Sequence, residues 1–454
     1  MRKILRWLLL LGLLAILVPF WLLAQQQTAP KPVTTTVNVS NPIPSTFFGM
    51  HVAVHLTSYS TPILAPVVVG AVGKGVATVW SYTEHSRGVY SSWGPLDQQV
   101  AFGKSHNAPV FEGTQYEPAW AVSDPSECRN SSQPGILFCE AAPSDLTTVA
   151  ACQDPLAGVV TTDCAWKEYL TTLVNRYKSA GIQTGCTAQN PQCNGVIEMY
   201  EGWNEPDGSS GGTMANFVTL QTDFLNTVRA NDPGARVCSP AFDMGSSSKY
   251  YANLMNSFFS NGGPKTWDCY DFHANDPTPE GQIADINQFK TVLRNNGIDP
   301  SAVTIYASEA GRWGGCVTIS DAEEQAYVAR IELLYWSNGV KRHYWYAYDT
   351  CGALTNQPAR STLKPVGIAY GIVESWMVGA TMSTPCSANG TVWTCGFTRS
   401  SPSGYQALAV WNTTGTSTYV PSPQYTTYQD LNGNVGSISG SATISQQPIL
   451  LTAK

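Results

Sequence analysis

Short apolar runs alternate with longer amphipathic stretches along most of this 454-residue chain. Eight of the runs are rich in β-branched or aromatic residues and are bounded by Gly, Pro or Asp, which is typical of β-strands. Their sequences are FFGMHVAV, GVATVWSY, APVFEGT, VIEMYEGW, ARVCSPAF, CYDFHA, VTIYASE and RHYWYAY. We therefore expect eight strands, the first beginning at residue 47 and the last ending at residue 348.

Helical patterns occupy the stretches between these runs. Apolar side chains fall on one stripe in residues 166–181, and residues 217–234 end in a Pro-Gly break. Residues 320–339 begin with a capping-box spacing and end in glycine. Strands that alternate with helices over about 310 residues favour an α/β fold, the (β/α)8 TIM barrel. A doubly wound sheet is the competing architecture, but no glycine-rich phosphate loop follows the first strand.

The texture of the chain changes after about residue 363. Residues 363–380 still have a helical pattern and can close the barrel, whereas the following residues are rich in Ser, Thr and Gly with short alternating runs. We predict a catalytic barrel over residues 41–380 and an antiparallel β-sandwich module over residues 381–454. Residues 25–40 are interpreted as a linker whose alternating run TTTVNVS can add a strand to the module.

The first 24 residues have the pattern of an export signal. Arg2, Lys3 and Arg6 precede an uncharged apolar run over residues 7–24, and polar glutamines follow. This pattern fits a cleaved signal peptide, and also a retained signal-anchor, since the run is close to the roughly 20 residues that span a bilayer. Both place the remaining chain outside the cytoplasm. We expect a secreted or extracytoplasmic protein, with residues 7–24 as a membrane tether where the signal is retained.

Twelve cysteines are consistent with an oxidising compartment. The chain lacks the CxxC spacings with nearby histidines that a zinc site would need. Connectivity cannot be fixed from sequence, so pairing of neighbours is our hypothesis. The predicted pairs are Cys128–Cys139, Cys152–Cys164, Cys186–Cys193, Cys238–Cys269, Cys316–Cys351 and Cys386–Cys395.

Composition and charge narrow the class of partner. The net charge of −7 and the pI near 5.4 exclude nucleic acid, because no basic field is present to neutralise phosphates. The counts of 21 Tyr and 14 Trp are high, and aromatic rings pack well against the flat C–H faces of sugars. Most of these rings belong to a core, but exposed ones would be platforms on which an oligo- or polysaccharide can pack, and we expect a monomeric chain.

Two glutamates directly follow predicted strands. Glu205 ends the fourth strand, just before Pro206, and Glu309 ends the seventh strand in YASEAG. Side chains at the carboxyl ends of barrel strands gather at one mouth, so residues about a hundred positions apart can be neighbours. Cleavage of a glycosidic bond needs a carboxylic acid and a carboxylate on either side of that bond. The pair therefore predicts a glycosidase in which mutual repulsion keeps one carboxyl protonated.

These motifs resemble those of clan A glycoside hydrolases. WNEP before a Gly/Ser-rich loop and SEAG after a strand are typical of the clan. FFGMHV, LDQQVAFGKSHNAPV, EPAWA, YEGWNEPD and DFHA are similar to glycoside hydrolase family 39, which groups β-xylosidases, α-L-iduronidases and bacterial exopolysaccharide endoglycosidases. The resemblance runs from about residue 45 to the C-terminus. It implies a retaining enzyme without cofactor or metal, with Glu205 as acid/base and Glu309 as nucleophile.

The resemblance also implies a set of substrate-binding residues. Asn204 would bind the hydroxyl beside the anomeric centre, and Trp345 would form an apolar floor under the reacting sugar. The remaining members would lie near the nucleophile, contact hydroxyls or line a subsite: His273, His51, Trp120 and Trp203. One departure from the family is Thr78, because relatives often carry an arginine two positions before the tryptophan of the second strand.

Other residues with catalytic or metal-binding chemistry have structural interpretations. Glu112 and Glu117 lie near strand ends, and Glu201 is interpreted as a buried group that supports the site. His51 and His55 have a spacing that could ligate a metal, but no third ligand is evident. A serine hydrolase lacks its G-x-S-x-G motif.

Two other classes of function compete with the glycosidase. One is a carbohydrate-binding barrel with little or no turnover, and the other is a surface-anchored structural protein. The presence of both glutamates argues against the first. The loops over residues 121–165 and 206–213 would set the sugar specificity. The segment between the third and fourth strands either walls off a pocket, which would give exo action, or borders an open groove, which would give endo action. Export and anchoring favour endo action on a polysaccharide.

Overall fold

The computed structural model describes most of the chain after residue 40, namely residues 41–54, 59–74, 79–90, 93–130, 136–178, 196–207, 210–245, 249–274, 276–311, 319–350 and 352–453. The predicted signal, the tether over residues 7–24 and the linker all lie outside these ranges. Within them, no helix combines the length and the apolar character needed to cross a membrane.

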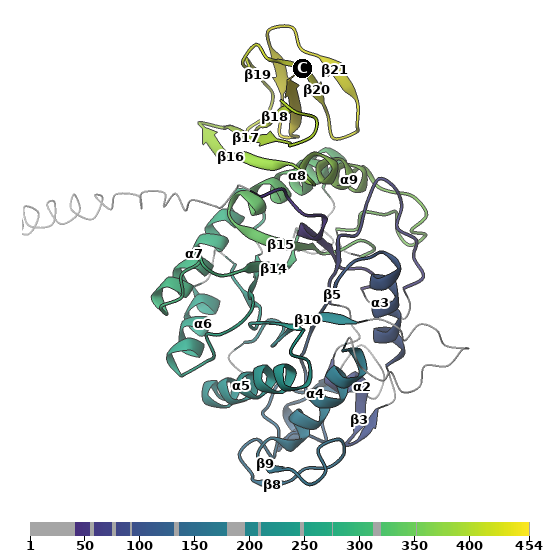
Figure 1. Ribbon diagram of the computed structural model, residues 1–454, viewed down its shortest axis with the longest axis vertical. Helices are drawn as coiled ribbons and strands as arrows, with labels where there is room; N and C mark the ends of the chain where they lie inside the picture. The colour runs from purple at the N-terminus through teal and green to yellow at the C-terminus, as the bar shows by residue number, and fades with distance from the viewer. Residues whose placement is uncertain are drawn as a thin grey trace, which may run out of the picture. The chain divides into compact units, whose positions relative to one another are not determined.

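A curled sheet of parallel strands forms the larger part of the fold (Figure 1). Neighbouring strands pair in parallel throughout. Their spatial order is β11 (Arg236–Cys238), β10 (Ile197–Glu201), β5 (Val110–Gly113), β2 (Ala71–Val72), β1 (Phe48–Met50), β15 (Val340–Trp345), β14 (Ile305–Ala310), β13 (Tyr270–Ala274) and β12 (Phe242–Asp243). This sheet fits a TIM-like barrel.

The two ends of the sheet come from one short stretch of chain. β11 pairs with β10, and β12, four residues further on, pairs with β13. An isolated bridge between Cys238 and Cys269 joins β11 to the residue before β13. The ring of strands is therefore completed through residues 236–243. The eightfold repeat itself stays a prediction, since nine strand segments are distinguished among the described residues.

Helices cover the outer face of the sheet (Figure 1). Outward side chains of the strands and apolar side chains of the helices share one continuous core. The helices are α3 (Gly94–Ser105), α4 (Cys164–Tyr177), α5 (Met214–Asn231), α6 (Tyr250–Ser260), α7 (Gln282–Asn295), α8 (Asp321–Ser337) and α9 (Pro365–Met377). Helices predicted within 166–181, 217–234, 320–339 and 363–380 are confirmed as α4, α5, α8 and α9. α8 begins with the predicted capping box of Ser320 and Glu323.

The second strand lies earlier than predicted. The sequence pattern placed it at residues 75–82, but β2 is Ala71–Val72 and α2 (Trp80–Thr83) is a short helix. Glycines on either side of β2 conceal its apolar pattern. A side chain at Gly70 would collide with the backbone carbonyl of Ser45, so close packing requires glycine there. Thr78 lies outside the described residues.

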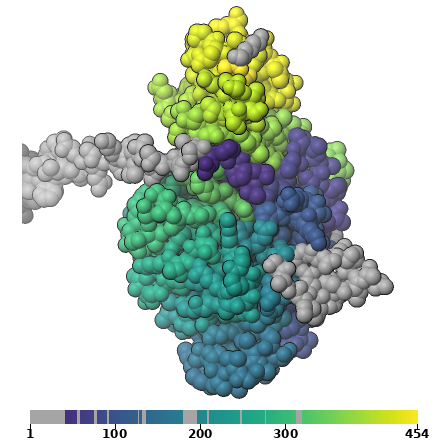
Figure 2. Space-filling model, viewed as in Figure 1, coloured from purple at the N-terminus to yellow at the C-terminus, as the bar shows by residue number. Residues whose placement is uncertain are grey.

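The segment between β5 and α4 forms short antiparallel pairs held by disulfides. β6 (Arg129–Asn130) pairs with β7 (Leu137–Phe138), and β8 (Ala150–Ala151) pairs with β9 (Val160–Thr161). A similar pair, β3 (Glu84–Ser86) with β4 (Val89–Tyr90), follows α2. In Figure 2, the blue atoms of the segment between β5 and α4 form a continuous region of the surface. Single turns of 3-10 helix occur at η1 (Ser45–Phe47) and η3 (Pro125–Glu127).

Residues from 381 onward form a β-sandwich. Its larger sheet is antiparallel, in the order β16 (Thr381–Asn389), β17 (Val392–Thr398), β18 (Gln406–Asn412), β23 (Ile449–Ala453), β20 (Tyr425–Gln429) and β21 (Val435–Ser437). The smaller sheet pairs β19 (Ser417–Tyr419) with β22 (Ala442–Ile444). Val410, Ile444 and Leu451 are buried in one cluster that joins the two sheets.

Four of the six predicted disulfides are confirmed. They are Cys128–Cys139, Cys152–Cys164, Cys238–Cys269 and Cys386–Cys395. The cysteines of the other two predicted pairs, at positions 186, 193, 316 and 351, lie outside the described residues. Four disulfides indicate folding in an oxidising, extracytoplasmic compartment.

Candidate functional site

Glu205 and Glu309 lie together at the carboxyl-terminal mouth of the barrel. Glu309 belongs to β14 and is buried, whereas Glu205 follows the end of β10 and is partly exposed. One carboxylate oxygen of each glutamate and one ring nitrogen of His273 all lie within 4.8 Å of one another. The structure therefore brings the two sequence-predicted catalytic carboxyls into one group.

The backbone around Glu205 is held by both neighbouring strands. The amide of Asn204 donates to the carbonyl of Thr114 at 3.1 Å, and the amide of Glu205 donates to that of Ala241 at 3.0 Å. Glu205 has a φ of 47°, in the left-handed region that a glutamate rarely adopts. This conformation turns the chain into Pro206. The Oδ1 atom of Asn204 is buried without a hydrogen-bond partner among the described residues, so it can accept a bond from a ligand hydroxyl.

His273 connects Glu205 to a buried lysine. Its Nδ1 lies 2.8 Å from Glu205 Oε1, and its Nε2 lies 3.1 Å from Lys74 Nζ. Burial and the Lys74 charge lower the pKa of His273, but its bond to Glu205 and the nearby carboxylates raise it overall. An ammonium group has only donors, so we assign the lone pair to Nε2 and the proton to Nδ1. His273 thus donates a hydrogen bond to Glu205.

Lys74 is a member of the site that sequence reasoning missed. Its ammonium lies 2.8 and 2.9 Å from the two oxygens of Glu201, which is fully buried. Burial alone would lower the pKa of Lys74, but the charges of Glu201, Glu309 and Asp271 outweigh it and raise the pKa. Lys74 therefore supplies a cation near the glutamates, from the end of the true second strand. Its one signal in the sequence is a lysine between glycines after an apolar run.

The two glutamates differ in proton affinity. Burial, with the charges of Glu205 and Glu201, raises the pKa of Glu309 to about 7 against the opposing charges of His273 and Lys74. Burial acts on Glu205 too, but the His273 hydrogen bond and the Lys74 charge outweigh it and lower the pKa of Glu205. The pair holds one proton between them below about pH 7, and in this structure Glu309 is the favoured holder.

This electrostatic arrangement has a consequence for stability. In the folded protein Glu309 keeps its proton up to about pH 7, whereas in the unfolded chain its pKa has the usual value of 4.5. The folded state therefore loses relative stability as the pH rises from about 4.5 to 7. We expect Glu309→Gln to be more stable than the wild type at pH 8, by at most about 3 kcal/mol, and by much less at pH 5.

Chemical denaturation of both proteins at pH 5 and pH 8 checks this expectation. Glu198→Gln, which removes an exposed carboxylate, is the matched control and should show no such pH-dependent gain. Equal stabilisation of the Glu309 variant at the two pH values would contradict the raised pKa.

His51 lies between two backbone carbonyls. Its Nδ1 lies 2.9 Å from the carbonyl of Lys74, and its Nε2 lies 2.7 Å from that of Ser308. Burial lowers the pKa of His51 to about 3, so the ring is neutral and donates to one of the two carbonyls. The side chain is 1% exposed. His51 is thus buried between β14 and the residues after β2, and it is not placed for the contact with sugar hydroxyls that the resemblance implies.

Trp345 points away from the glutamates. It is buried, and its ring packs against Tyr327 of α8 at 6.2 Å between centroids. Tyr346, the next residue, instead lies 5.2 Å from the ring of His51. Burial and the charges of Glu309 and Glu205 raise the pKa of Tyr346. A shift of one residue moves a side chain to the other face of a strand, so Tyr346, and not Trp345, faces the glutamates.

The other two predicted tryptophans have structural partners. Trp203 is buried against Phe217 of α5, with ring centroids 6.0 Å apart in an edge-on arrangement. Trp120 is partly buried, and its indole donates to the carbonyl of Glu84 at 3.0 Å. Trp203 belongs to the core outside the barrel, and no contact joins Trp120 to the glutamates among the described residues.

The spacing of Glu205, His273 and Glu309 would also suit a metal ion. However, the Lys74 ammonium beside His273 would repel a cation, and the proton on Nδ1 occupies the nitrogen that faces the carboxylates. A second cluster, Cys152, Cys164 and Glu168, has its two cysteines in a disulfide. The side chains of this site are better suited to proton transfer than to metal binding.

Comparison with known proteins gives matches among solved structures. No family model matches the chain, and no curated protein matches it. A family 39 glycoside hydrolase from Bacteroides cellulosilyticus WH2 has a TM-score of 0.62 at 15% identity, over 92% of this chain and 82% of that one. The chain has the fold of a glycoside hydrolase.

Two further structures support this fold. A family 51 α-L-arabinofuranosidase from Bifidobacterium longum has a TM-score of 0.58 at 10% identity, over 91% of this chain and 97% of that one. A family 44 xyloglucanase from Paenibacillus polymyxa has a TM-score of 0.53 at 12% identity, over 92% and 98%. At such identities the likeness establishes the architecture, and the chemistry has to be argued from the side chains.

Proposed function

We propose that this chain is a retaining glycoside hydrolase that cleaves β-type bonds of an oligo- or polysaccharide by double displacement. The observation that carries the proposal is the approach of Glu205 and Glu309, whose oxygens come within 4.8 Å at the mouth of the barrel. Carboxyls about 5–5.5 Å apart are typical of retaining enzymes, whereas about 6.5–9.5 Å is typical of inverting ones. The shared fold with glycoside hydrolases supports the same class.

In the first step, Glu309 attacks the anomeric carbon as Glu205 protonates the leaving oxygen. This step requires that Glu205 carries the shared proton, although Glu309 is the favoured holder of that proton in the enzyme without substrate. Positive charge that develops on the sugar favours ionised Glu309, and an ionised Glu309 in turn raises the proton affinity of Glu205. The bound sugar would therefore drive the proton from one glutamate to the other.

In the second step, Glu205 acts as a base. Once Glu309 is esterified by the sugar, its negative charge is gone, and the proton affinity of Glu205 falls. The His273 hydrogen bond and the Lys74 charge then stabilise the Glu205 carboxylate, which can take a proton from water. The same neighbours thus suit both roles, because the charge on Glu309 switches between the steps.

The proposed setting is extracytoplasmic, with a glycan as substrate and action within a polysaccharide chain. The four disulfides and the signal-like residues 1–24 support export, and Asn204 and Tyr346 supply a hydrogen-bond acceptor and an aromatic face for a sugar. The solved relatives include a xyloglucanase, an enzyme named for a polysaccharide.

The test is a panel of aryl glycosides and polysaccharides incubated with the purified chain. Release of reducing ends identifies the substrate, and proton NMR of the first product reports the anomeric configuration. We expect retention. Early formation of the inverted anomer would overturn the double displacement. Glycan binding without turnover across the panel would favour a carbohydrate-binding barrel instead.

A further inference from the structure

A pocket of about 550 Å³ lies at the amino-terminal end of the barrel strands, opposite the glutamates. Its lining residues begin or precede strands: Pro109 precedes β5, Ile197 begins β10 and Arg236 begins β11. Arg342, the third residue of β15, contributes a second guanidinium group. Nothing in the proposed hydrolysis uses this pocket.

Arg342 is a buried cation without a carboxylate partner. Its side chain is 7% exposed, and its Nη1 lies 3.2 Å from the hydroxyl of Tyr344 and 3.2 Å from the sulfur of Met199. Its guanidinium also lies over the ring of Tyr306, 5.2 Å from the centroid. Within the described ranges, no carboxylate comes within 4.0 Å of Arg342. Buried charges are ordinarily paired, so this one calls for an anion.

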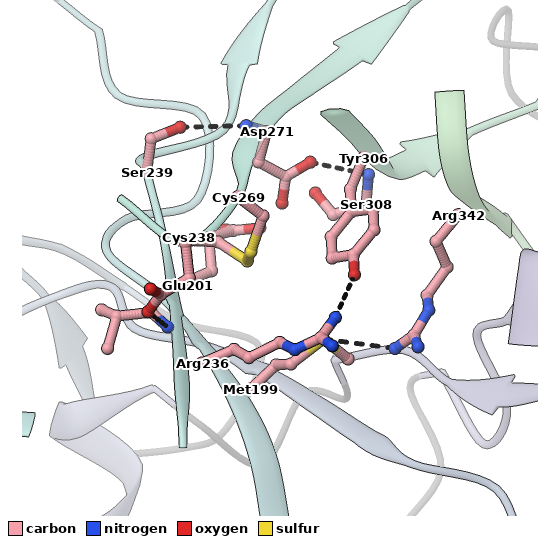
Figure 3. Close-up of a disulfide and its surroundings, with 12 residues drawn as sticks. Met199, Glu201, Arg236, Cys238, Ser239, Cys269, Asp271, Tyr306, Ser308 and Arg342 are labelled. Carbon is pink, nitrogen blue, oxygen red and sulfur yellow. Dashed lines mark hydrogen bonds between the residues drawn. A yellow bond between two sulfur atoms is a disulfide. The ribbon is translucent and has the colours of Figure 1, made fainter. Parts of the chain in front are cut away.

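Arg236 brings a second positive charge to the same place. Its Nη1 donates to the hydroxyl of Tyr306 at 2.9 Å, so one tyrosine contacts both arginines. Figure 3 shows both guanidinium groups near the hydroxyl end of Tyr306, beneath the Cys238–Cys269 disulfide. Two guanidinium groups repel each other, and an anion between them would replace that repulsion with attraction.

The acidic residues of the pocket make no ion-pair contact with these arginines. Glu198 is exposed and acts on Arg342 through its charge, and Asp232 accepts a hydrogen bond from the amide of Gly234 at 3.1 Å. Neither forms an ion pair with Arg236 or Arg342 in the described structure. Arg342 lines the pocket, and none of its nitrogens is among the fully buried donors that lack a partner. Its remaining guanidinium nitrogens can therefore be reached from the pocket.

We propose that this pocket binds an oxyanion between Arg236 and Arg342. The planar guanidinium fork matches the oxygens of sulfate, phosphate or a carboxylate, and Arg is the side chain best suited to such bidentate contacts. The pocket is large enough for an acidic sugar, so the anion is either a free inorganic ion or the charged group of a saccharide. Because Arg236 of β11 and Arg342 of β15 both bind the anion, its binding stabilises the folded barrel.

Isothermal titration calorimetry on the full chain tests the proposal, with separate titrations of sodium sulfate, sodium phosphate and glucuronate at constant chloride. Concentrations in the low millimolar range avoid the general stabilisation of proteins by sulfate. We expect saturable binding of at least one ligand, weakened at least tenfold in Arg342→Met, which keeps much of the packing volume. Arg294→Met removes an exposed arginine of α7 and is expected to bind as the wild type does.

The arms of the titration distinguish the sources of the anion. Tighter binding of sulfate or phosphate identifies a free ion, and tighter binding of glucuronate identifies an acidic saccharide. Circular dichroism checks that Arg342→Met folds. Where it does not, Arg236→Gln, at the exposed first residue of β11, takes its place. Absence of saturable binding by all three ligands overturns the proposal. So does binding that is equally tight in the wild type and in the folded arginine variants.

Discussion

Glu309→Ala is expected to lower kcat on every substrate by about 10⁴-fold or more, because it removes the proposed nucleophile. The carboxylate is buried, and one of its oxygens lies within 4.8 Å of an oxygen of Glu205. Full activity in this variant would contradict the mechanism. The assay is release of the aryl group from the best aryl glycoside found in the panel.

Azide provides the matching rescue experiment. Removal of the Glu309 side chain leaves space on the face of the sugar opposite the leaving group, which a small anion can enter. Azide should restore turnover and give the glycosyl azide of inverted configuration, identified by NMR. Rescue with a product of retained configuration would place the missing nucleophile elsewhere.

Glu205→Ala is expected to show a different pattern that depends on the leaving group. Loss of a general acid lowers the rate by about 10²–10⁴-fold where the leaving oxygen needs a proton, as in a polysaccharide. An activated aryl leaving group needs no proton, so the glycosyl-enzyme should still form and then hydrolyse slowly, since the base is missing too. Mass spectrometry of the intact protein detects this intermediate.

The control for both variants is Glu198→Ala, which removes an exposed carboxylate on the same strand as the Glu205 motif. It should retain wild-type rates on both kinds of substrate. Equal losses of the Glu205 variant on polysaccharide and activated glycoside would indicate a structural role for Glu205.

The helices could be predicted from amphipathic periodicity, and the two glutamates could be predicted from their positions at strand ends. The helical stripes of residues 166–181 and 320–339 are long enough to be unambiguous, and their helices form as predicted. Glu205 and Glu309 stand out because each follows an apolar strand and precedes a break in the pattern. Such features are local, and local patterns are what a single sequence carries.

The parts that could not be predicted depend on contacts between distant segments. Lys74 joins Glu201 and His273, which lie more than a hundred residues away, and nothing in the sequence around Lys74 indicates them. Strand β2 is two residues long, too short for a period to be recognised. Tyr346 rather than Trp345 lies beside the site, because facing depends on the exact residue at which the strand ends.

The left-handed backbone at Glu205 has a consequence for attempts to engineer this protein. Glycine or asparagine would occupy that conformation with less strain, a difference of order 1 kcal/mol for a glutamate. Directed evolution or computational redesign that rewards thermostability alone would therefore favour losing Glu205. A selection for a more thermostable variant therefore has to measure sugar turnover in every round. The residue that gives the highest thermostability at this position is expected to differ from the residue that gives activity.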